Sequence, residues 1–140
     1  MILLDTTILV YAVGDQHPLR EPCRRVLAAH ADGRIEASTT VEAIQEFVHV
    51  RARRRTRDDA VALARSFAQA FDLLVFTPDD LDLGLSLFVR HPNLGAFDAL
   101  LAGAALNHGA EALISADRAF AAIPGIRWID PTGSGLGEIL

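Results

Sequence analysis

The sequence predicts an α/β protein in which a parallel sheet of about five strands carries helices on both faces. Short apolar segments alternate with longer segments of helical periodicity along the whole 140-residue chain, which is the pattern of βαβ units. Three of the strand segments, residues 2–4, 73–76 and 112–115, are almost entirely apolar, as in a parallel sheet that is covered on both sides. No repeat or linker divides the chain, so we expect a single domain over residues 1–140.

The first half of the chain is predicted to contain two strands and three helices. The strands cover residues 2–4 and 34–38, and the helices cover residues 6–13, 19–31 and 39–54. The second helix ends near Gly33, and the third has apolar residues at helical spacing. Thr39 and Glu42 have the spacing of a capping box at the start of that third helix.

The second half repeats this alternation. Strands are predicted at residues 73–76, 112–115 and 126–130, and helices at residues 58–71, 79–90 and 95–109. Residues 116–123 are predicted to form a turn with a short helix. The glycine-rich tail, residues 131–140, is expected to be loose.

The composition is that of a globular protein, with 51% hydrophobic and 22% charged residues. No apolar run approaches the ~20 residues of a membrane span, and no signal peptide is evident, so we expect a cytoplasmic protein without membrane contact. Cys23 is the only cysteine, which excludes an internal disulfide and any multi-cysteine zinc site.

The net charge of −5 does not indicate a nucleic-acid binder, but the basic residues are unevenly placed. All 13 are arginines, and five of them lie in the segment RARRRTR, residues 51–57. Such a patch binds phosphates locally even on an acidic protein, or it is the solvated end of a helix. The candidate phosphate-binding residues of this patch are Arg51, Arg53, Arg54 and Arg55.

Four acidic residues are predicted to meet at the carboxyl-end edge of the sheet, where ligands of open α/β sheets bind. Asp5 and Asp117 follow predicted strands, Glu46 lies in the helix after residues 34–38, and Asp98 lies in a helix first turn. Two carboxylates ~4 Å apart repel by about 4 kcal/mol, so such a cluster must bind protons or cations. Oxygen ligands suit Mg²⁺ or Mn²⁺.

Each acid, taken alone, is also explained as a helix cap or turn residue, and this reading is preferred for several of them. Glu42 fits the capping box, and Asp130 precedes a proline and fits a turn. The acids at the start of the helix 79–90 fit a helix start and exposed positions, namely Asp79, Asp80 and Asp82. The five histidines show no metal-ligand spacing and are interpreted as surface or cap residues.

Other enzyme and binding classes that share this pattern meet specific objections. A haloacid dehalogenase-type phosphatase needs a second aspartate two residues after the first, where this chain has Thr7, and a lysine, which the chain lacks. A phosphoacceptor receiver domain also needs a lysine. A nucleoside-binding Rossmann module is unsupported because no glycine-rich turn follows the first strand.

Four segments in order resemble the PIN domain, and more closely the VapC toxins of bacterial type II toxin–antitoxin pairs. They are MILLDTTILVYA, STTVEAIQEFVHVRARR, FDALLAGAALNHGAEALISADRAF and GIRWIDP. The resemblance runs nearly end to end. It implies a Rossmann-like sheet and a Mg²⁺-dependent endoribonuclease with a small VapB-like antitoxin as partner.

The resemblance also assigns roles to residues of this chain. It implies that Asp5, Glu46, Asp98 and Asp117 are the catalytic and metal-binding acids, and it places a small hydroxyl residue at Thr7. Whether Glu46 or Glu42 is the second acid stays open, although the QEFV segment fits the family better at Glu46. We further expect a homodimer. The main alternative is a non-catalytic RNA- or partner-binding domain of the same fold.

Overall fold

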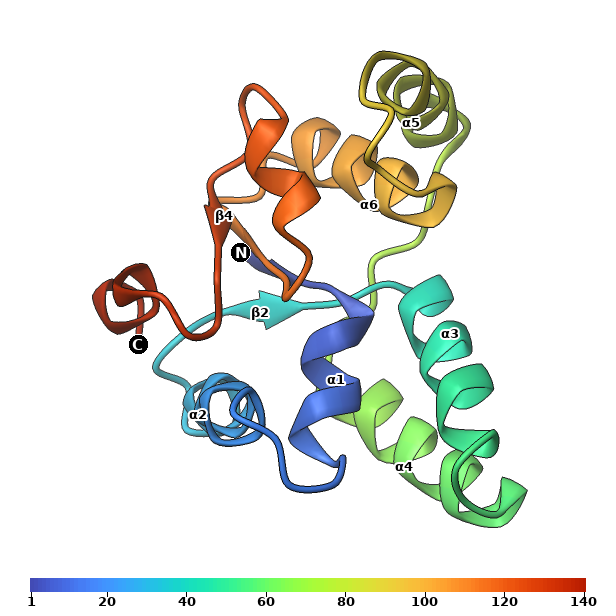
Figure 1. The fold of residues 1–140 in the computed structure, drawn as a ribbon, viewed down its shortest axis with the longest axis vertical. Coiled ribbons are helices and arrows are strands. Elements are labelled where there is room, and N and C mark those ends of the chain that lie inside the picture. Colours follow the sequence, from blue (N-terminus) through green and yellow to red (C-terminus); the bar gives the residue numbers. More distant parts are fainter.

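A parallel sheet forms the centre of the computed structural model, which describes residues 1–140. Its strands are β1 (Ile2–Leu4), β2 (Ala37–Ser38), β3 (Ala112–Ile114) and β4 (Trp128–Ile129). Their order across the sheet is β2-β1-β3-β4, and every pairing is parallel. Figure 1 shows this sheet between two groups of helices. The predicted α/β class and parallel sheet are therefore confirmed.

Six α-helices and two short 3₁₀ helices complete the fold. They are α1 (Thr6–Ala12), α2 (Arg20–Ala31), α3 (Val41–Ala52), α4 (Arg57–Ala70), α5 (Pro78–Arg90), α6 (Ala96–Asn107), η1 (Arg118–Ala122) and η2 (Ser134–Glu138). None of these helices combines the length and the apolar character that a membrane span requires.

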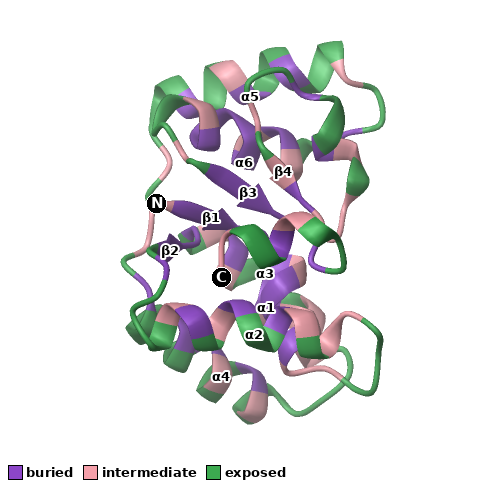
Figure 2. Ribbon diagram, turned by 90° about the vertical axis from the view of Figure 1, so that its left-hand side faces the viewer, coloured by how far each residue is buried: buried purple, intermediate pink, exposed green.

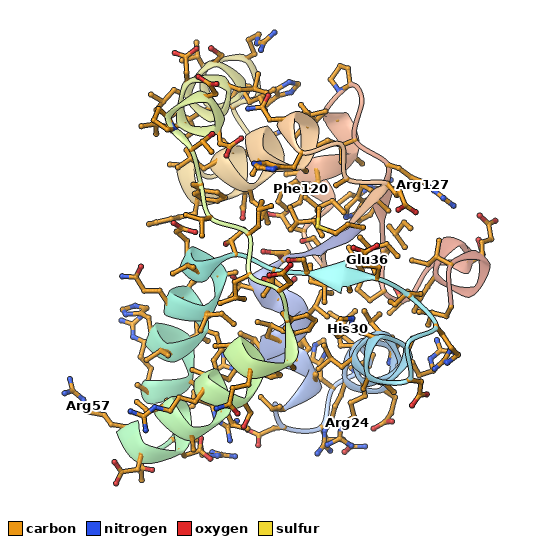
Figure 3. All side chains as sticks on the ribbon, turned by 180° about the vertical axis from the view of Figure 1, so that it is seen from behind. Arg24, His30, Glu36, Arg57, Phe120 and Arg127 are labelled. Atoms are coloured by element: carbon orange, nitrogen blue, oxygen red, sulfur yellow. The ribbon has the colours of Figure 1, made fainter.

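Two apolar cores lie on opposite faces of the sheet, because alternate strand residues point to opposite sides. Ile2 and Leu4 of β1 pack with side chains of α1 to α4, whereas Leu3 packs with side chains of α6. Phe120 of η1 belongs to the second core and is labelled in Figure 3. The buried strands between the two helical layers are visible in Figure 2. Helices therefore cover both faces, as expected.

Helices α5 and α6 pack especially closely, because two glycines face the partner helix. A β-carbon at Gly84 would lie 2.8 Å from the Leu100 Cα, and one at Gly103 would lie 2.7 Å from the Asp80 carbonyl oxygen. Both distances are shorter than any normal carbon contact. The pair therefore forms one closely packed layer, in which α6, with Asp98 in its first turn, lies against the sheet.

Four predicted local features differ from the structure. Residues 73–76 form only an isolated bridge, between Thr40 and Leu74, instead of a fifth strand. The N-cap of α3 is Thr40, whose side chain accepts from the Ala43 amide, so the capping box from Thr39 to Glu42 is wrong. Thr39 donates instead to the Leu4 carbonyl oxygen.

The other two differences concern burial. Asp80 lies at a helix start, as expected, but none of its surface is exposed, because its carboxylate closes a capping box with Thr77. The tail was expected to be loose, but residues 134–138 form η2 and bury Leu136 in the core beside α2. The glycine-rich composition hid the apolar residues that hold this segment in place, namely Leu136 with Ile139 and Leu140.

Candidate active site

Asp5 stands where β1 ends and α1 begins, as the sequence predicted. It is the N-cap residue of α1 and only 3% of its surface is exposed. Its Oδ2 atom accepts hydrogen bonds from the Thr7 hydroxyl at 2.6 Å and the Ser115 hydroxyl at 2.7 Å. These two donors fix the direction of the carboxylate without neutralising its charge.

Asp117 lies in the loop after β3 and caps η1, where its Oδ1 accepts from the Ala119 amide at 2.8 Å. The Asp117 amide donates to the Ser115 hydroxyl at 2.9 Å, and the Ala116 amide donates to the Thr7 hydroxyl at 3.1 Å. Thr7 and Ser115 therefore link Asp5 to the loop that carries Asp117. Hydrogen bonding across β1 and β3 sets the distance between these two acids.

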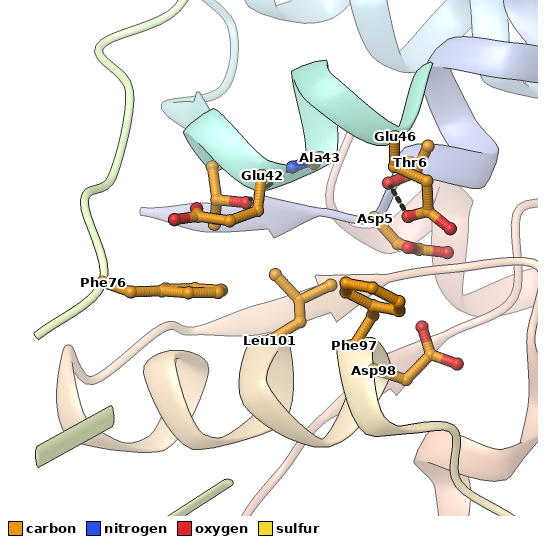
Figure 4. A pocket seen from close by; sticks show the side chains of 10 residues that line it. Asp5, Thr6, Glu42, Ala43, Glu46, Phe76, Phe97, Asp98 and Leu101 are labelled. Carbon is orange, nitrogen blue, oxygen red and sulfur yellow. Dashed lines mark hydrogen bonds between the residues drawn. The ribbon is translucent and has the colours of Figure 1, made fainter. Parts of the chain in front are cut away.

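Glu46 and Asp98 approach the same place from two helices on opposite faces of the sheet. Glu46 projects from α3, and its Oε2 accepts from the Thr6 hydroxyl at 2.7 Å, as drawn in Figure 4. Asp98 projects from the first turn of α6. Burial, and then the charges of Asp5, Asp117 and Glu46, raise the pKa of Asp98 to about 7. The four carboxylates thus share one electrostatic environment.

One cavity of about 290 Å³ brings together all four predicted acids, and Thr6, Thr7 and Arg54 line it as well. Glu42 does not reach this cavity. It lines a narrower neighbouring pocket instead. The geometry therefore groups Glu46, and not Glu42, with the other three acids, while the catalytic roles of all four stay a prediction.

Two residues of the site were missed by the sequence analysis. Thr6 orients Glu46, and Ser115, which is fully buried, orients Asp5. Both are hydroxyl residues within two positions of a predicted acid, in the segments DTT and SAD. That proximity is the signal that could have identified them.

The arginine segment does not act as one patch. The Arg51 guanidinium pairs with both oxygens of Asp59, at 2.5 and 3.2 Å, and donates to the Val13 carbonyl oxygen. Arg55 pairs with Asp15 at 2.6 Å. Arg53 is exposed, and Figure 3 shows Arg57 pointing outward from the start of α4. Arg54 alone among the five lines the carboxylate cavity.

The donor set of the cavity can be compared with what a metal ion requires. All four side chains offer carboxylate oxygens, which hard cations such as Mg²⁺ prefer. No group of three or more His, Cys, Asp or Glu side chains is arranged as a metal site in the structure. Mg²⁺ keeps several of its waters and needs only one or two direct carboxylates. The residue types therefore fit a partly hydrated cation.

A family model described as the PIN domain matches residues 2–126. The match contains all four acids of the cavity and most of the fold. The chain belongs to the PIN domain family. As a PIN domain, it has its acidic cavity at the carboxyl ends of β1 and β3, as the topology requires.

Related sequences place this PIN domain among the VapC proteins. It is 49% identical over 144 residues to Ribonuclease VapC7 of Mycobacterium tuberculosis, covering 100% of this chain and 98% of that protein. It is 35% identical over 103 residues to Ribonuclease VapC23 of the same species, covering 71% of this chain and 79% of that protein. The suspected VapC relationship is therefore confirmed.

Solved structures show the same fold at low sequence identity. VapBC2 from Rickettsia felis, bound to a DNA fragment from its promoter, matches with a TM-score of 0.74 and 19% identity, over 93% of this chain and 98% of that chain. FitAcB from Neisseria gonorrhoeae matches with a TM-score of 0.73 and 17% identity, over 94% of this chain and 98% of that chain. The fold is therefore shared over 93% to 94% of this PIN domain.

Proposed function

We propose that this protein is a Mg²⁺- or Mn²⁺-dependent endoribonuclease and the toxin of a type II toxin–antitoxin pair. The observation that carries the proposal is the convergence of Asp5, Glu46, Asp98 and Asp117 on one cavity. The names of the VapC relatives support RNA as the substrate. The alternative, a non-catalytic RNA- or partner-binding domain, does not account for a complete set of four acids.

Asp5 and Asp98 would hold the cation directly, and Glu46 and Asp117 would hold its water ligands or a second ion. When bound, Mg²⁺ or Mn²⁺ supplies Lewis acidity, which makes the scissile phosphorus more electrophilic and an attacking water more acidic. Burial, and then the charges of the other three acids, raise the pKa of Asp98 to about 7, and a bound cation would offset that repulsion.

The remaining residues of the cavity orient the acids and the substrate. Thr7 and Ser115 hold Asp5, and Thr6 holds Glu46, through the hydroxyl donors described above. Arg54 lines the cavity and forms no ion pair with a carboxylate. Its guanidinium would bind a phosphate next to the scissile one. Where the RNA backbone permits, two N–H groups would donate to two oxygens of that phosphate.

The proposal is tested by RNA cleavage. Structured RNAs are incubated with the purified protein in Mg²⁺, in Mn²⁺ and in EDTA, and the Asp5→Asn variant serves as the control. We expect cleavage by the wild type with either cation and none in EDTA. RNA binding without cleavage under every divalent ion would replace the nuclease with the non-catalytic alternative.

We also propose that the protein is cytoplasmic, forms a homodimer and binds a small VapB-like antitoxin. One outward face of α5 carries large apolar side chains at helical spacing, and these are Leu81, Leu85, Phe88 and Val89. Contiguous exposed apolar surface of this kind marks protein interfaces. The solved VapBC2 assembly supports a VapB-like partner. A single monomeric species by light scattering at tens of micromolar would contradict the dimer.

A further inference from the structure

A second, narrower pocket adjoins the carboxylate cavity, and Arg54 does not line it. We call it the α3–α6 slot, because Glu42 and Ala43 of α3 face Phe97 and Leu101 of α6 across it, with Phe76 at its far end. The slot and the cavity share Asp5, Thr6, Glu46 and Asp98. A chain lying with one phosphate at the acids therefore has the slot within reach of its neighbouring nucleotide.

The slot contains an acceptor that nothing in the protein uses. The Oε2 atom of Glu42 is buried and has no hydrogen-bond partner. Such an atom is costly to bury, because its hydration is lost and no hydrogen bond replaces it. The capping box that would have explained Glu42 is absent, since Thr40 caps the helix with its own hydroxyl. Within the chain this oxygen has no donor, so it is free to accept a hydrogen bond from a water molecule or from a ligand that enters the slot.

The walls of the slot are aromatic and one of them is exposed. The Phe97 side chain has 75% of its surface exposed, directly beside Asp98. Figure 4 shows Phe76, Leu101 and Phe97 along one side of the slot and Glu42 opposite them. Proteins that read single-stranded RNA stack its bases on aromatic rings and bind their edges with polar side chains.

We propose that the α3–α6 slot binds a guanine base adjacent to the scissile phosphate, with Glu42 as the residue that determines specificity. A carboxylate is an acceptor only. Guanine presents two neighbouring donors, N1–H and the N2 amino group, whereas the other bases place an acceptor beside their donor. A carboxylate therefore favours guanine over adenine, cytosine and uracil. This inference rests on the proposed function for the presence of RNA at the acids.

Opening of the slot is part of the proposal. The space between its walls is about 20 Å³, enough for a water molecule and too small for a base. The Phe97 ring must therefore turn outward before a base enters, and its exposure leaves it room to do so. Exposed side chains change rotamer in picoseconds to nanoseconds, so this step does not limit cleavage.

The test uses four short oligoribonucleotides of uridine that contain one guanosine, one adenosine, one cytidine or no other base. We expect the wild type to cleave the guanosine RNA about tenfold faster than the others, as a paired base contact discriminates. The Glu42→Gln variant should bring this ratio of rates close to one, because an amide presents a donor to guanine. Glu36→Gln is the matched control, since Glu36 is exposed on the loop before β2.

A second variant separates specificity from folding. Glu42→Leu should raise the melting temperature, because it removes the unpartnered oxygen from the apolar slot, and it should also abolish the guanosine preference. Equal cleavage of all four RNAs by the wild type, or an unchanged ratio in Glu42→Gln, would overturn the slot and leave the nuclease intact.

Fluorescence anisotropy is used to measure binding of the same RNAs in EDTA. This measurement distinguishes failure of the proposed nuclease from failure of the slot. If no RNA is cleaved with any cation but the guanosine RNA still binds tightest, and Glu42→Gln loses that preference, then the slot stands and the proposed nuclease falls.

Discussion

Asp5 and Asp80 are the two buried carboxylates of the molecule, and their surroundings are opposite in kind. Asp80 accepts from the Thr77 amide and hydroxyl and from the Asn107 side chain, and His108 Nε2 lies 3.1 Å from it. Burial acts to raise the pKa of Asp80, but these hydrogen bonds together lower it to about 2.

Asp5 has two hydroxyl donors and three carboxylates for neighbours. The close approach of the four carboxylates is seen in the pKa of Asp98, which burial and the charges of the other three acids raise to about 7. Burial alone thus does not distinguish a functional acid from a structural one. The two kinds of acid are distinguished by the balance between hydrogen-bond donors and like charges around the carboxylate. This balance leads to opposite expectations for an Asp→Asn substitution at the two sites.

The largest expected effect is on catalysis by Asp5→Asn. The substitution keeps the shape of the side chain and removes one charge from the proposed cation site, so RNA cleavage should fall by about 100-fold or more. Asp80→Asn should leave cleavage within about threefold of the wild type, because Asp80 belongs to the α5–α6 network and not to the cavity. Rates on one RNA substrate measure both, and comparable losses in the two variants would erase the distinction.

The same two substitutions should rank in the opposite order in their effect on the free energy of unfolding. Asp80→Asn removes a charge that four neighbouring groups stabilise, and it should lower the free energy of unfolding by about 2–3 kcal/mol. Asp5→Asn should hold or raise stability in EDTA, since its amide oxygen still accepts from Thr7 and Ser115 while repulsion with Asp98 falls. Urea unfolding in EDTA checks both. A marked loss in Asp5→Asn would make Asp5 a structural acid.

The pH dependence of this difference follows from the lowered pKa of Asp80. Because the folded pKa is about 2 and the ordinary value is 3.8, the folded state binds fewer protons than the unfolded state between these values. Asp80 therefore contributes about 2 kcal/mol above pH 4, which is lost as the pH falls toward 2. The stability of wild type minus that of Asp80→Asn, measured by urea unfolding from pH 7 to 2, should shrink over that window. A difference independent of pH would assign the effect to packing.

The two carboxylate sites also show what the sequence could reveal. Asp5, Asp98 and Asp117 were predictable, because the carboxyl ends of parallel strands and the first turns of nearby helices share one edge of the sheet. Asp80 was not, because its partners Asn107 and His108 lie at the far end of another helix. Spacing in the sequence predicts which residues are neighbours along one helix. It does not predict which hydrogen-bond donors of a second helix lie beside a carboxylate.

Local ambiguity explains the remaining differences. The capping-box spacing occurs both at Thr39–Glu42 and at Thr77–Asp80, and only the second forms, because Thr39 is drawn to the Leu4 carbonyl oxygen. Residues 73–76 read as a strand by composition, yet Val75 is 65% exposed and a single bridge joins the segment to Thr40. Strands β1 and β3 were identified correctly because burial on both faces leaves an unbroken apolar run.

The smallest expected effect concerns the arginine at the rim of the carboxylate cavity. Arg54 has no carboxylate partner, whereas Arg51 is held by Asp59 and Val13. If Arg54 binds one phosphate, Arg54→Gln should weaken RNA binding several-fold. It should also reduce the slope of log affinity against log salt by about 0.7, the value for one contact on single-stranded nucleic acid.

Arg53→Gln is the matched control for that measurement, because Arg53 is exposed on the same segment and does not line the cavity. Binding is measured in EDTA at several salt concentrations, so that no RNA is consumed. Equal slope changes in both variants would mean that the arginines attract RNA through their summed field and not through a fixed contact. A slope change confined to Arg54→Gln would place one phosphate beside the acids. Asp5 is held there by hydroxyl groups and surrounded by like charges, whereas all the charge of Asp80 is balanced by hydrogen-bond donors.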